Sequence, residues 1–156
     1  MSLVQNIQSL LKSNFSEYTY LRATSGAEAD ILLSQSDLKN KPVILFYNVP
    51  EITVTQGVSN LEESYPVQIM VGYQLDIDAS GDEKDEVFEA CKAILDKFWD
   101  LLLQDANFQK IVQTKQGDNV YNLIPVASLE IGGENITGYR LETDIKLHRS
   151  SQTLDT

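Results

Sequence analysis

Two stretches of the chain alternate between apolar and polar residues for longer than a typical strand. In Val67–Asp78 the odd positions are apolar or aromatic and the even positions are mostly polar, and Tyr139–His148 follows the same alternation. A period of two predicts strands with one buried face and one solvated face. At about 3.3 Å per residue, each strand would span on the order of 35–40 Å, which suits an extended surface better than a small pocket.

The segment between these strands predicts a long amphipathic helix over Asp82–Leu103. Ser80 is placed to cap its start, with Glu83 three residues later. A second, short helix is predicted after Ser2, ending near Asn14, because Leu3, Val4, Ile7, Leu10 and Leu11 share one helical face. The apolar stripe of the long helix consists of Val87, Ala90, Cys91, Ile94, Leu95, Phe98, Leu101 and Leu102.

The other segments of the first half have shorter patterns. The apolar run Pro42–Tyr47 predicts a central strand with both faces covered, and Ile52–Thr55 continues the sheet. Phe15–Ala23 predicts a strand or an extended arm, and Ala27–Leu33 a weak helix. Gln56–Tyr65 is largely polar with an acidic pair, and it predicts a loop.

The C-terminal part predicts a hairpin. Val120–Ile131 is a candidate strand that Pro125 confines to an edge or a bulge, and Gly132–Asn135 is a turn that folds it against Tyr139–His148. Strands on both sides of one main helix favour an α+β fold, with an antiparallel (mixed) β-sheet of long strands and helices packed on one face. We expect a single domain over residues 1–149 and a disordered tail over residues 150–156.

The charge narrows the classes of partner. The 156 residues carry a formal net charge of −11 at pH 7. Non-specific adhesion to nucleic acid or to anionic membranes needs a basic surface, so we expect neither, although DNA could slide past a negative wall without binding. The N-terminus lacks the basic and apolar parts of a signal peptide, and no apolar run is long enough for a membrane span. We therefore expect folding in a reducing cytoplasm.

Catalytic constellations are not apparent in the sequence. Cys91 is the one cysteine and lies on an apolar helical stripe, which predicts a small buried hydrophobe. His148 is the one histidine and falls at a polar strand position. Nucleophile elbows, Walker-type loops, dinucleotide-binding glycine motifs and zinc-ligand spacings are missing from the sequence. We expect a protein that is not an enzyme and needs no cofactor.

One short segment resembles the opening of a calcium loop. Asp76-Ile77-Asp78-Ala79-Ser80-Gly81-Asp82 places oxygen ligands at alternate positions and a glycine at the turn, with Asp76, Asp78, Ser80 and Asp82 as candidate ligands. The twelfth position should be a bidentate Glu but is Val87. The same residues also fit a strand end, a turn and a helix cap. A calcium-responsive binding module therefore remains as an alternative function.

A further candidate site is the acidic side of the strands. Asp76, Asp78, Glu142 and Asp144 occupy polar positions of the two long strands, and Glu130 lies on the strand before the hairpin turn. These carboxylates fit ordinary solvation, or a functional electronegative surface in an oligomer. A third hypothesis is a small enzyme whose site is assembled from scattered carboxylates and tyrosines.

The order of elements resembles the small tail-terminator and tail-completion proteins of long-tailed bacteriophages, and related neck proteins. An N-terminal amphipathic helix leads to Pro42–Tyr47, Glu63–Val71 introduces a long strand, the acidic helix Asp82–Leu103 follows, and the hairpin Val120–His148 closes the chain. The resemblance covers roughly residues 1–149 and rests on element order, length and acidity.

This resemblance implies a specific biological setting. Such proteins assemble as rings, often hexameric, that cap the tail tube and join it to the head, and they commonly present a negative channel to DNA. It implies a non-enzymatic structural protein of a phage or prophage particle, with copies of itself and with tail-tube and neck proteins as partners. The protein would be assembled in the bacterial cytoplasm and end up in the virion, and Asp76, Asp78, Glu130, Glu142 and Asp144 would be the candidates for lining or flanking the channel.

Overall fold

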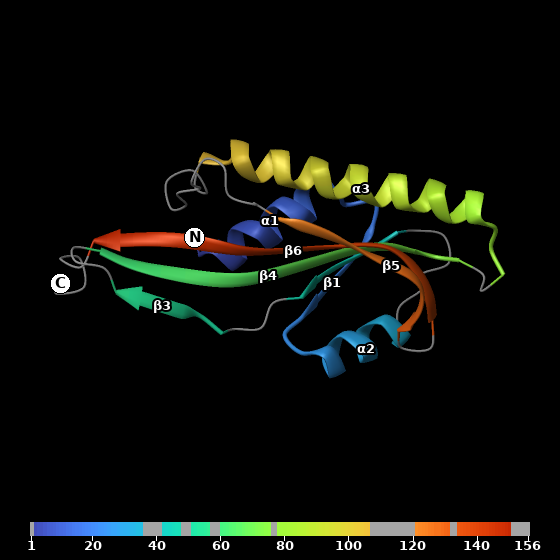
Figure 1. Cartoon of the computed structure of the whole chain (residues 1–156), viewed down its shortest axis with the longest axis horizontal. Coiled ribbons are helices and arrows are strands. Elements are labelled where there is room, and N and C mark those ends of the chain that lie inside the picture. The colour runs from blue at the N-terminus through green and yellow to red at the C-terminus, as the bar shows by residue number, and fades with distance from the viewer. Residues whose placement is uncertain are drawn as a thin grey trace.

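The computed structural model describes residues 2–35, 42–47, 51–56, 60–75, 78–106, 121–131 and 134–150. These residues form a mixed six-stranded sheet with helices, so the predicted α+β class is confirmed (Figure 1). The elements in chain order are α1 (Leu3–Asn14), β1 (Thr19–Ala23), α2 (Gly26–Gln35), β2 (Val43–Tyr47), β3 (Thr53–Gln56), β4 (Asn60–Gln74), α3 (Gly81–Gln104), β5 (Asn122–Ile131) and β6 (Glu134–Ser150).

Strand β4 lies at the centre of the topology. The strands run in the order β1-β2-β4-β6-β5, and β1 pairs with β2 in parallel while the other pairs are antiparallel. Strand β6 pairs with every residue of β4 and so occupies one edge of β4. Strands β2 and β3 therefore share the opposite edge of β4. Strand β2 pairs with Gln68–Gly72 of β4, and β3 pairs with Leu61–Ser64.

Strands β4 and β6 extend farther than the helices do. They contain 15 and 17 residues, which at about 3.4 Å per residue correspond to roughly 50 Å or more. The 24 residues of α3 span only about 36 Å. One end of the sheet therefore projects beyond the helices (Figure 1); this projecting end consists of β3, Asn60–Pro66 of β4 and Asp144–Ser150 of β6.

Two predicted boundaries along β4 were wrong. The loop expected over Gln56–Tyr65 is largely strand, since β4 begins at Asn60, and the strand expected to reach Asp78 ends at Gln74. The loop prediction failed because Glu63 occupies an inward position. Its side chain is only 9% exposed and accepts a hydrogen bond from the Tyr65 hydroxyl at 2.7 Å, so a charged residue interrupts the expected apolar alternation.

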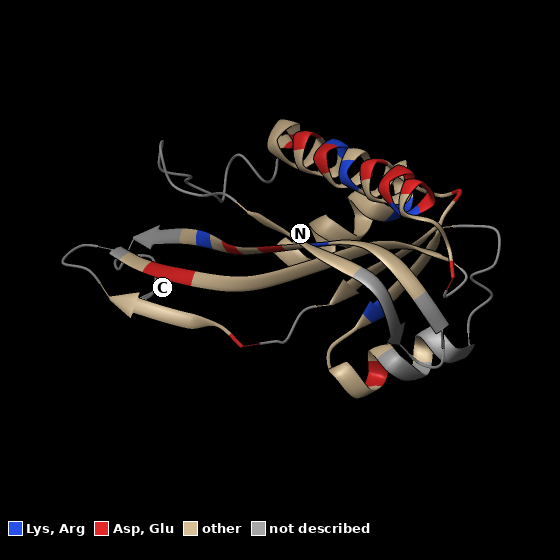
Figure 2. Cartoon of the chain, turned by 45° about the vertical axis from the view of Figure 1, so that its right-hand side comes forward, with Lys and Arg blue, Asp and Glu red and all other residues tan. Residues whose placement is uncertain are grey.

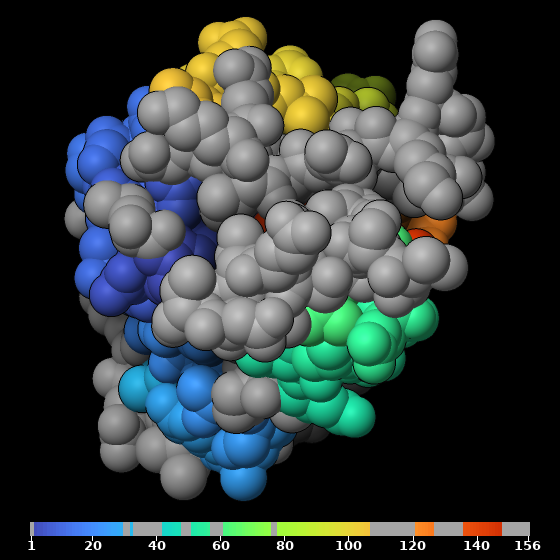
Figure 3. All heavy atoms as spheres, turned by 90° about the vertical axis from the view of Figure 1, so that its left-hand side faces the viewer, coloured from blue at the N-terminus to red at the C-terminus, as the bar shows by residue number. Residues whose placement is uncertain are grey.

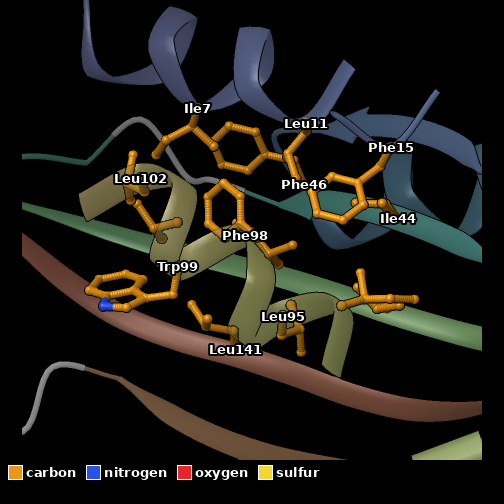
Figure 4. Packing of buried hydrophobic residues seen from close by; sticks show 14 of the residues in the cluster. Ile7, Leu11, Phe15, Ile44, Phe46, Leu95, Phe98, Trp99, Leu102 and Leu141 are labelled. Carbon is orange, nitrogen blue, oxygen red and sulfur yellow. The ribbon is translucent and has the colours of Figure 1, made fainter. Parts of the chain in front are cut away.

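Helices α1 and α3 cover one face of the sheet, as expected. Their apolar side chains meet the inward side chains of β2, β4 and β6 in a continuous core (Figure 4). The fully buried members of this core include Ile7, Leu11, Phe46, Ile69, Leu95, Phe98, Leu102 and Leu141. The predicted cap at Ser80 is present, since its hydroxyl accepts a hydrogen bond from the Glu83 amide, and the Ser2 hydroxyl caps α1 in the same way by accepting from the Gln5 amide.

Helix α2 packs on the opposite face, so the expectation that all helices lie on one face was wrong. Ala29 of α2 joins a second core with Val43 and Leu45 of β2 and with Met70 of β4. Both faces of β2 are therefore covered, as its continuous apolar run predicted. The face that α2 would cover was not predictable because α2 has only a weakly amphipathic pattern.

The sheet curves around α2. This helix contacts both β1 and β5, which form opposite edges of the sheet order, and Figure 1 shows the hairpin end of β5 and β6 bending towards it. Gly72 of β4 and Gly138 of β6 are directly paired near this bend. A Cβ on Gly138 would collide with the Val71 carbonyl oxygen and would lie 2.7 Å from the Gly72 Cα, so the two backbones approach too closely for a side chain.

Candidate functional site

The candidate calcium loop contains a structural cap. Asp76 lies outside the described residues, and Asp78 and Asp82 are exposed in the turn before α3 and in its first turn. The Ser80 hydroxyl accepts a hydrogen bond from the Glu83 amide at 3.2 Å, which is the geometry of a helix N-cap. In the part of the chain that the structure describes, no group of three His, Cys, Asp or Glu side chains could hold a metal ion.

The acidic strand residues are only partly brought together. Glu142 and Asp144 lie on the sheet face opposite Leu141 and Ile145, hence away from α1 and α3. Asp78 is in the turn before α3 rather than on a strand, and Glu130 belongs to β5 but its side chain is outside the described set. Of the five candidates, the structure therefore places Glu142 and Asp144 on one face.

This strand face carries mixed charge. The Arg140 Nε atom lies 2.8 Å from a Glu142 carboxylate oxygen, close enough for an ion pair although not aligned as a hydrogen bond. The Lys146 ammonium lies 3.8 Å from Glu62 on the neighbouring strand. These cations neutralise part of the acid, so the face is less negative than the strand sequence alone indicates.

Exposed acid is concentrated on the outer face of α3 instead (Figure 2). Glu89 and Asp100 extend the acidic start of the helix along its solvent side. We call this surface the acidic face of α3, and it consists of Asp82, Glu83, Asp85, Glu86, Glu89 and Asp100. The sequence already indicated an acidic helix over Asp82–Leu103, but the candidate functional surface was expected on the strands.

A polar contact fixes α3 against the start of β5. The Tyr121 hydroxyl donates a hydrogen bond to Asp96 at 3.0 Å, and the Lys92 ammonium contacts the other Asp96 oxygen at 2.5 Å. The hydrogen bond from Lys92, followed by that from Tyr121, lowers the pKa of the Asp96 carboxyl against the opposing effect of burial. The Trp99 and Tyr121 rings lie 4.9 Å apart, so the contact combines packing with charge.

The groups that sequence reasoning considered for catalysis are poorly placed for it. Cys91 is 0% exposed, and burial raises the pKa of its thiol to about 12. Burial likewise raises the pKa of Tyr20 to about 12, while its hydroxyl donates to Gln8 at 3.2 Å. The side chain of His148 is outside the described set. Cys91 and Tyr20 therefore stay protonated at neutral pH inside the fold.

The projecting end presents an unusual strand edge. All four residues of β3 are exposed, and the sequence Thr-Val-Thr-Gln carries no charge. Val54 is 55% exposed and the preceding Ile52 is 46% exposed, which makes them two of the three exposed large hydrophobic side chains among the described residues. Figure 3 shows this end of the molecule, with β3 in green at the surface.

Comparisons with known proteins supply no family for the chain. No protein-family model matches the sequence, and no curated protein matches it. Among the described residues, no helix is long and apolar enough to span a membrane.

Proposed function

We propose that this chain is a non-enzymatic structural subunit of a phage or prophage particle, which assembles with copies of itself into a ring at the tail end or the head–tail joint. The observation that carries the proposal is the projecting end of the sheet. Tyr65, Ile145 and Leu147 at the inner part of this end pack against the core, while the strands beyond them add mainly exposed edge. Such an extension suits contact with a neighbouring subunit.

The acidic face of α3 fits the same role. Its six carboxylates are exposed and outnumber the three lysines of α3, Lys84, Lys92 and Lys97. A ring that turned this face, or the Glu142 and Asp144 side of the sheet, towards a channel would repel DNA phosphates. DNA could then pass through without specific binding or adhesion.

The partners follow from this position in the particle. Copies of the chain would form the ring, and tail-tube and neck proteins would contact its two sides, with the assembled protein residing in the virion. No cofactor is required, since the work is mechanical joining. The resemblance in element order to tail-terminator and tail-completion proteins supports this reading.

Assembly on tails tests the proposal directly. The purified chain is mixed with tail tubes that lack their terminal protein, and tube ends are inspected by negative-stain electron microscopy beside a mass measurement by light scattering. We expect rings at one end of each tube and tubes of uniform length. A chain that stays monomeric at every concentration and leaves tube ends bare would overturn the proposal.

A matched variant tests the role of the acidic face. Glu86→Gln, Glu89→Gln and Asp100→Asn remove three exposed carboxylates from α3 without touching the core. Rings of this variant should still form on tubes, and they should retain DNA that passes freely through the unaltered ring. Equal DNA retention by both rings would assign the channel to another surface.

A further inference from the structure

We propose that β3 pairs with β3 of a second copy of this chain, antiparallel and about a two-fold axis at Val54. The two sheets would then continue into each other across the projecting ends. In the part of the chain that the structure describes, β3 pairs with one neighbour, β4, and leaves its other edge open. An open edge presents backbone donors and acceptors that can pair with another strand.

Apart from its shortness, the edge of β3 lacks the features that commonly protect exposed strands. It contains no charged residue, no proline and no bulge within its four residues. Strand β5, at the other side of the sheet, has Pro125 and a register shift between Val126 and Leu129. Proline and bulges both discourage pairing with a further strand, so β3 is the less protected of these two edges.

Charge favours a neutral contact between two copies. Each copy carries a net charge of −11, so most pairs of surfaces would repel one another. The uncharged β3 reduces this cost, because it brings no charged side chain of its own four residues to the contact. On the adjacent part of β4, Glu62 is partnered by Lys146 at 3.8 Å, which reduces the negative potential beside the strand.

The sequence of β3 is complementary to itself. Antiparallel pairing centred on Val54 places each Val54 opposite its counterpart in the second copy, and places Thr53 opposite the second copy's Thr55. Valine and threonine pairs are favourable cross-strand neighbours. Ile52 would meet the second copy's Gln56, so this register covers both exposed apolar side chains of the segment.

The short contact predicts a weak, concentration-dependent dimer. This register pairs five residues of each copy, Ile52–Gln56, which bury less than the roughly 1,200 Å² of a stable interface. The dimer should therefore exchange rapidly with monomer, and covalent trapping is the suitable measurement.

Cysteine trapping tests the register as well as the contact. The variant Val54→Cys should form a disulfide-linked dimer on mild oxidation, because equivalent residues face each other at the axis. Ile52→Cys and Gln56→Cys are the matched controls: each alone should cross-link poorly, and a mixture of the two should cross-link. The natural Cys91 is 0% exposed and is present equally in every variant.

Two outcomes would overturn the inference. One is the failure of Val54→Cys to trap a dimer above the background of unmutated protein, and the other is equal trapping by Val54→Cys and Ile52→Cys. A second variant removes dependence on disulfide chemistry: Val54→Lys places like charges at the axis and should abolish dimer in sedimentation at high concentration. The control Leu103→Lys changes an exposed apolar residue on α3 and should leave the dimer intact.

A two-fold contact closes with two copies, so it is separate from the head-to-tail contacts that the proposed ring needs. If Val54→Cys forms the disulfide-linked dimer but the chain forms no rings on tail tubes, the β3 contact is supported and the proposed ring is not. If the chain forms rings on tail tubes but Val54→Cys forms no disulfide-linked dimer, the proposed ring is supported and the β3 contact is not.

Discussion

Burial of the Cys91 side chain makes the free energy of unfolding depend on pH in the alkaline range. In the unfolded chain its thiol ionises near the ordinary pKa of 9.0, whereas in the fold burial raises the pKa to about 12. Above about pH 9 the unfolded state therefore binds fewer protons than the folded state, and stability falls as pH rises towards 12. The stability that this thiol contributes is fully present below pH 9.

We predict that the free energy of unfolding falls by about 1 kcal/mol between about pH 8 and pH 10 because of this thiol. Urea denaturation at the two pH values measures the loss. Cys91→Ala should be less stable at pH 8, since it leaves a small cavity, but should lack this part of the pH slope. An unchanged slope in Cys91→Ala would assign the alkaline sensitivity to other groups, such as Tyr20 above pH 10.

Single residues also show what sequence patterns could and could not reveal. The burial of Cys91 followed from its place on an apolar helical stripe. Asn6 is also buried, at 3% exposure, and donates a hydrogen bond at 2.9 Å to Asp105, 99 residues away. A partner so distant in sequence leaves no local periodicity, and the same holds for Glu63, whose inward position is visible only once β4 is built.

At the scale of elements, the paired glycines explain how β4 and β6 can curve. Gly72 and Gly138 are directly paired across β4 and β6, four residues from the start of β6 at the hairpin end that bends towards α2 (Figure 1). The restriction at Gly138 comes from the backbone of β4, which cannot move without breaking the strand pair. At Gly72 the nearest atom is the Ile136 Cγ2 methyl, at 2.5 Å, and the nearest backbone atom is the Thr137 carbonyl oxygen at 3.3 Å, so the backbone is less tightly opposed than at Gly138.

We predict a graded effect of alanine at these positions. Gly138→Ala should destabilise the fold by about 2–4 kcal/mol, since backbone must shift, and Gly72→Ala should cost less. Gly26→Ala is the control: a Cβ there meets nothing within 4 Å, so the change should be neutral or slightly stabilising. Chemical denaturation of the three variants gives the order, and equal losses at Gly138 and Gly26 would contradict the account of the bend.

Elements with strong periodicity were predicted well, and elements defined by their neighbours were not. Helix α3 was expected over Asp82–Leu103 and spans Gly81–Gln104. The hairpin of β5 and β6 was likewise expected and is confirmed by their antiparallel pairing. The first part of β4 and the face covered by α2 were missed, because both depend on contacts with strands far away in the sequence.

At the scale of the whole molecule, the sequence fixes the amount of charge but not its location. Ion pairs with Arg140 and Lys146 offset part of the acid on the strands, and this pairing depends on register. The exposed acid lies mainly on α3, while the uncharged edge of β3 lies at the projecting end. The acidity of α3 could be recognised from the helical pattern, whereas the uncharged edge of β3 could not be recognised before the strands were placed beside one another.

This separation of charge predicts how association responds to salt. Copies of a chain with net charge −11 repel at low ionic strength, and about 0.1 M salt reduces the screening length to about 10 Å. Since the proposed β3 contact contains no ion pair, added salt should strengthen association. Lowering the pH towards the isoelectric point of 4.4 should act in the same direction.

Light scattering at high protein concentration, in about 20 mM and about 300 mM NaCl, measures the effect. The variant carrying Glu86→Gln, Glu89→Gln and Asp100→Asn supplies the control, because its reduced charge should permit association at low salt and flatten the response. The mass of the unaltered chain should rise with salt. If salt instead dissociates the oligomer, ion pairs hold the copies together and the neutral strand edge is not the principal contact.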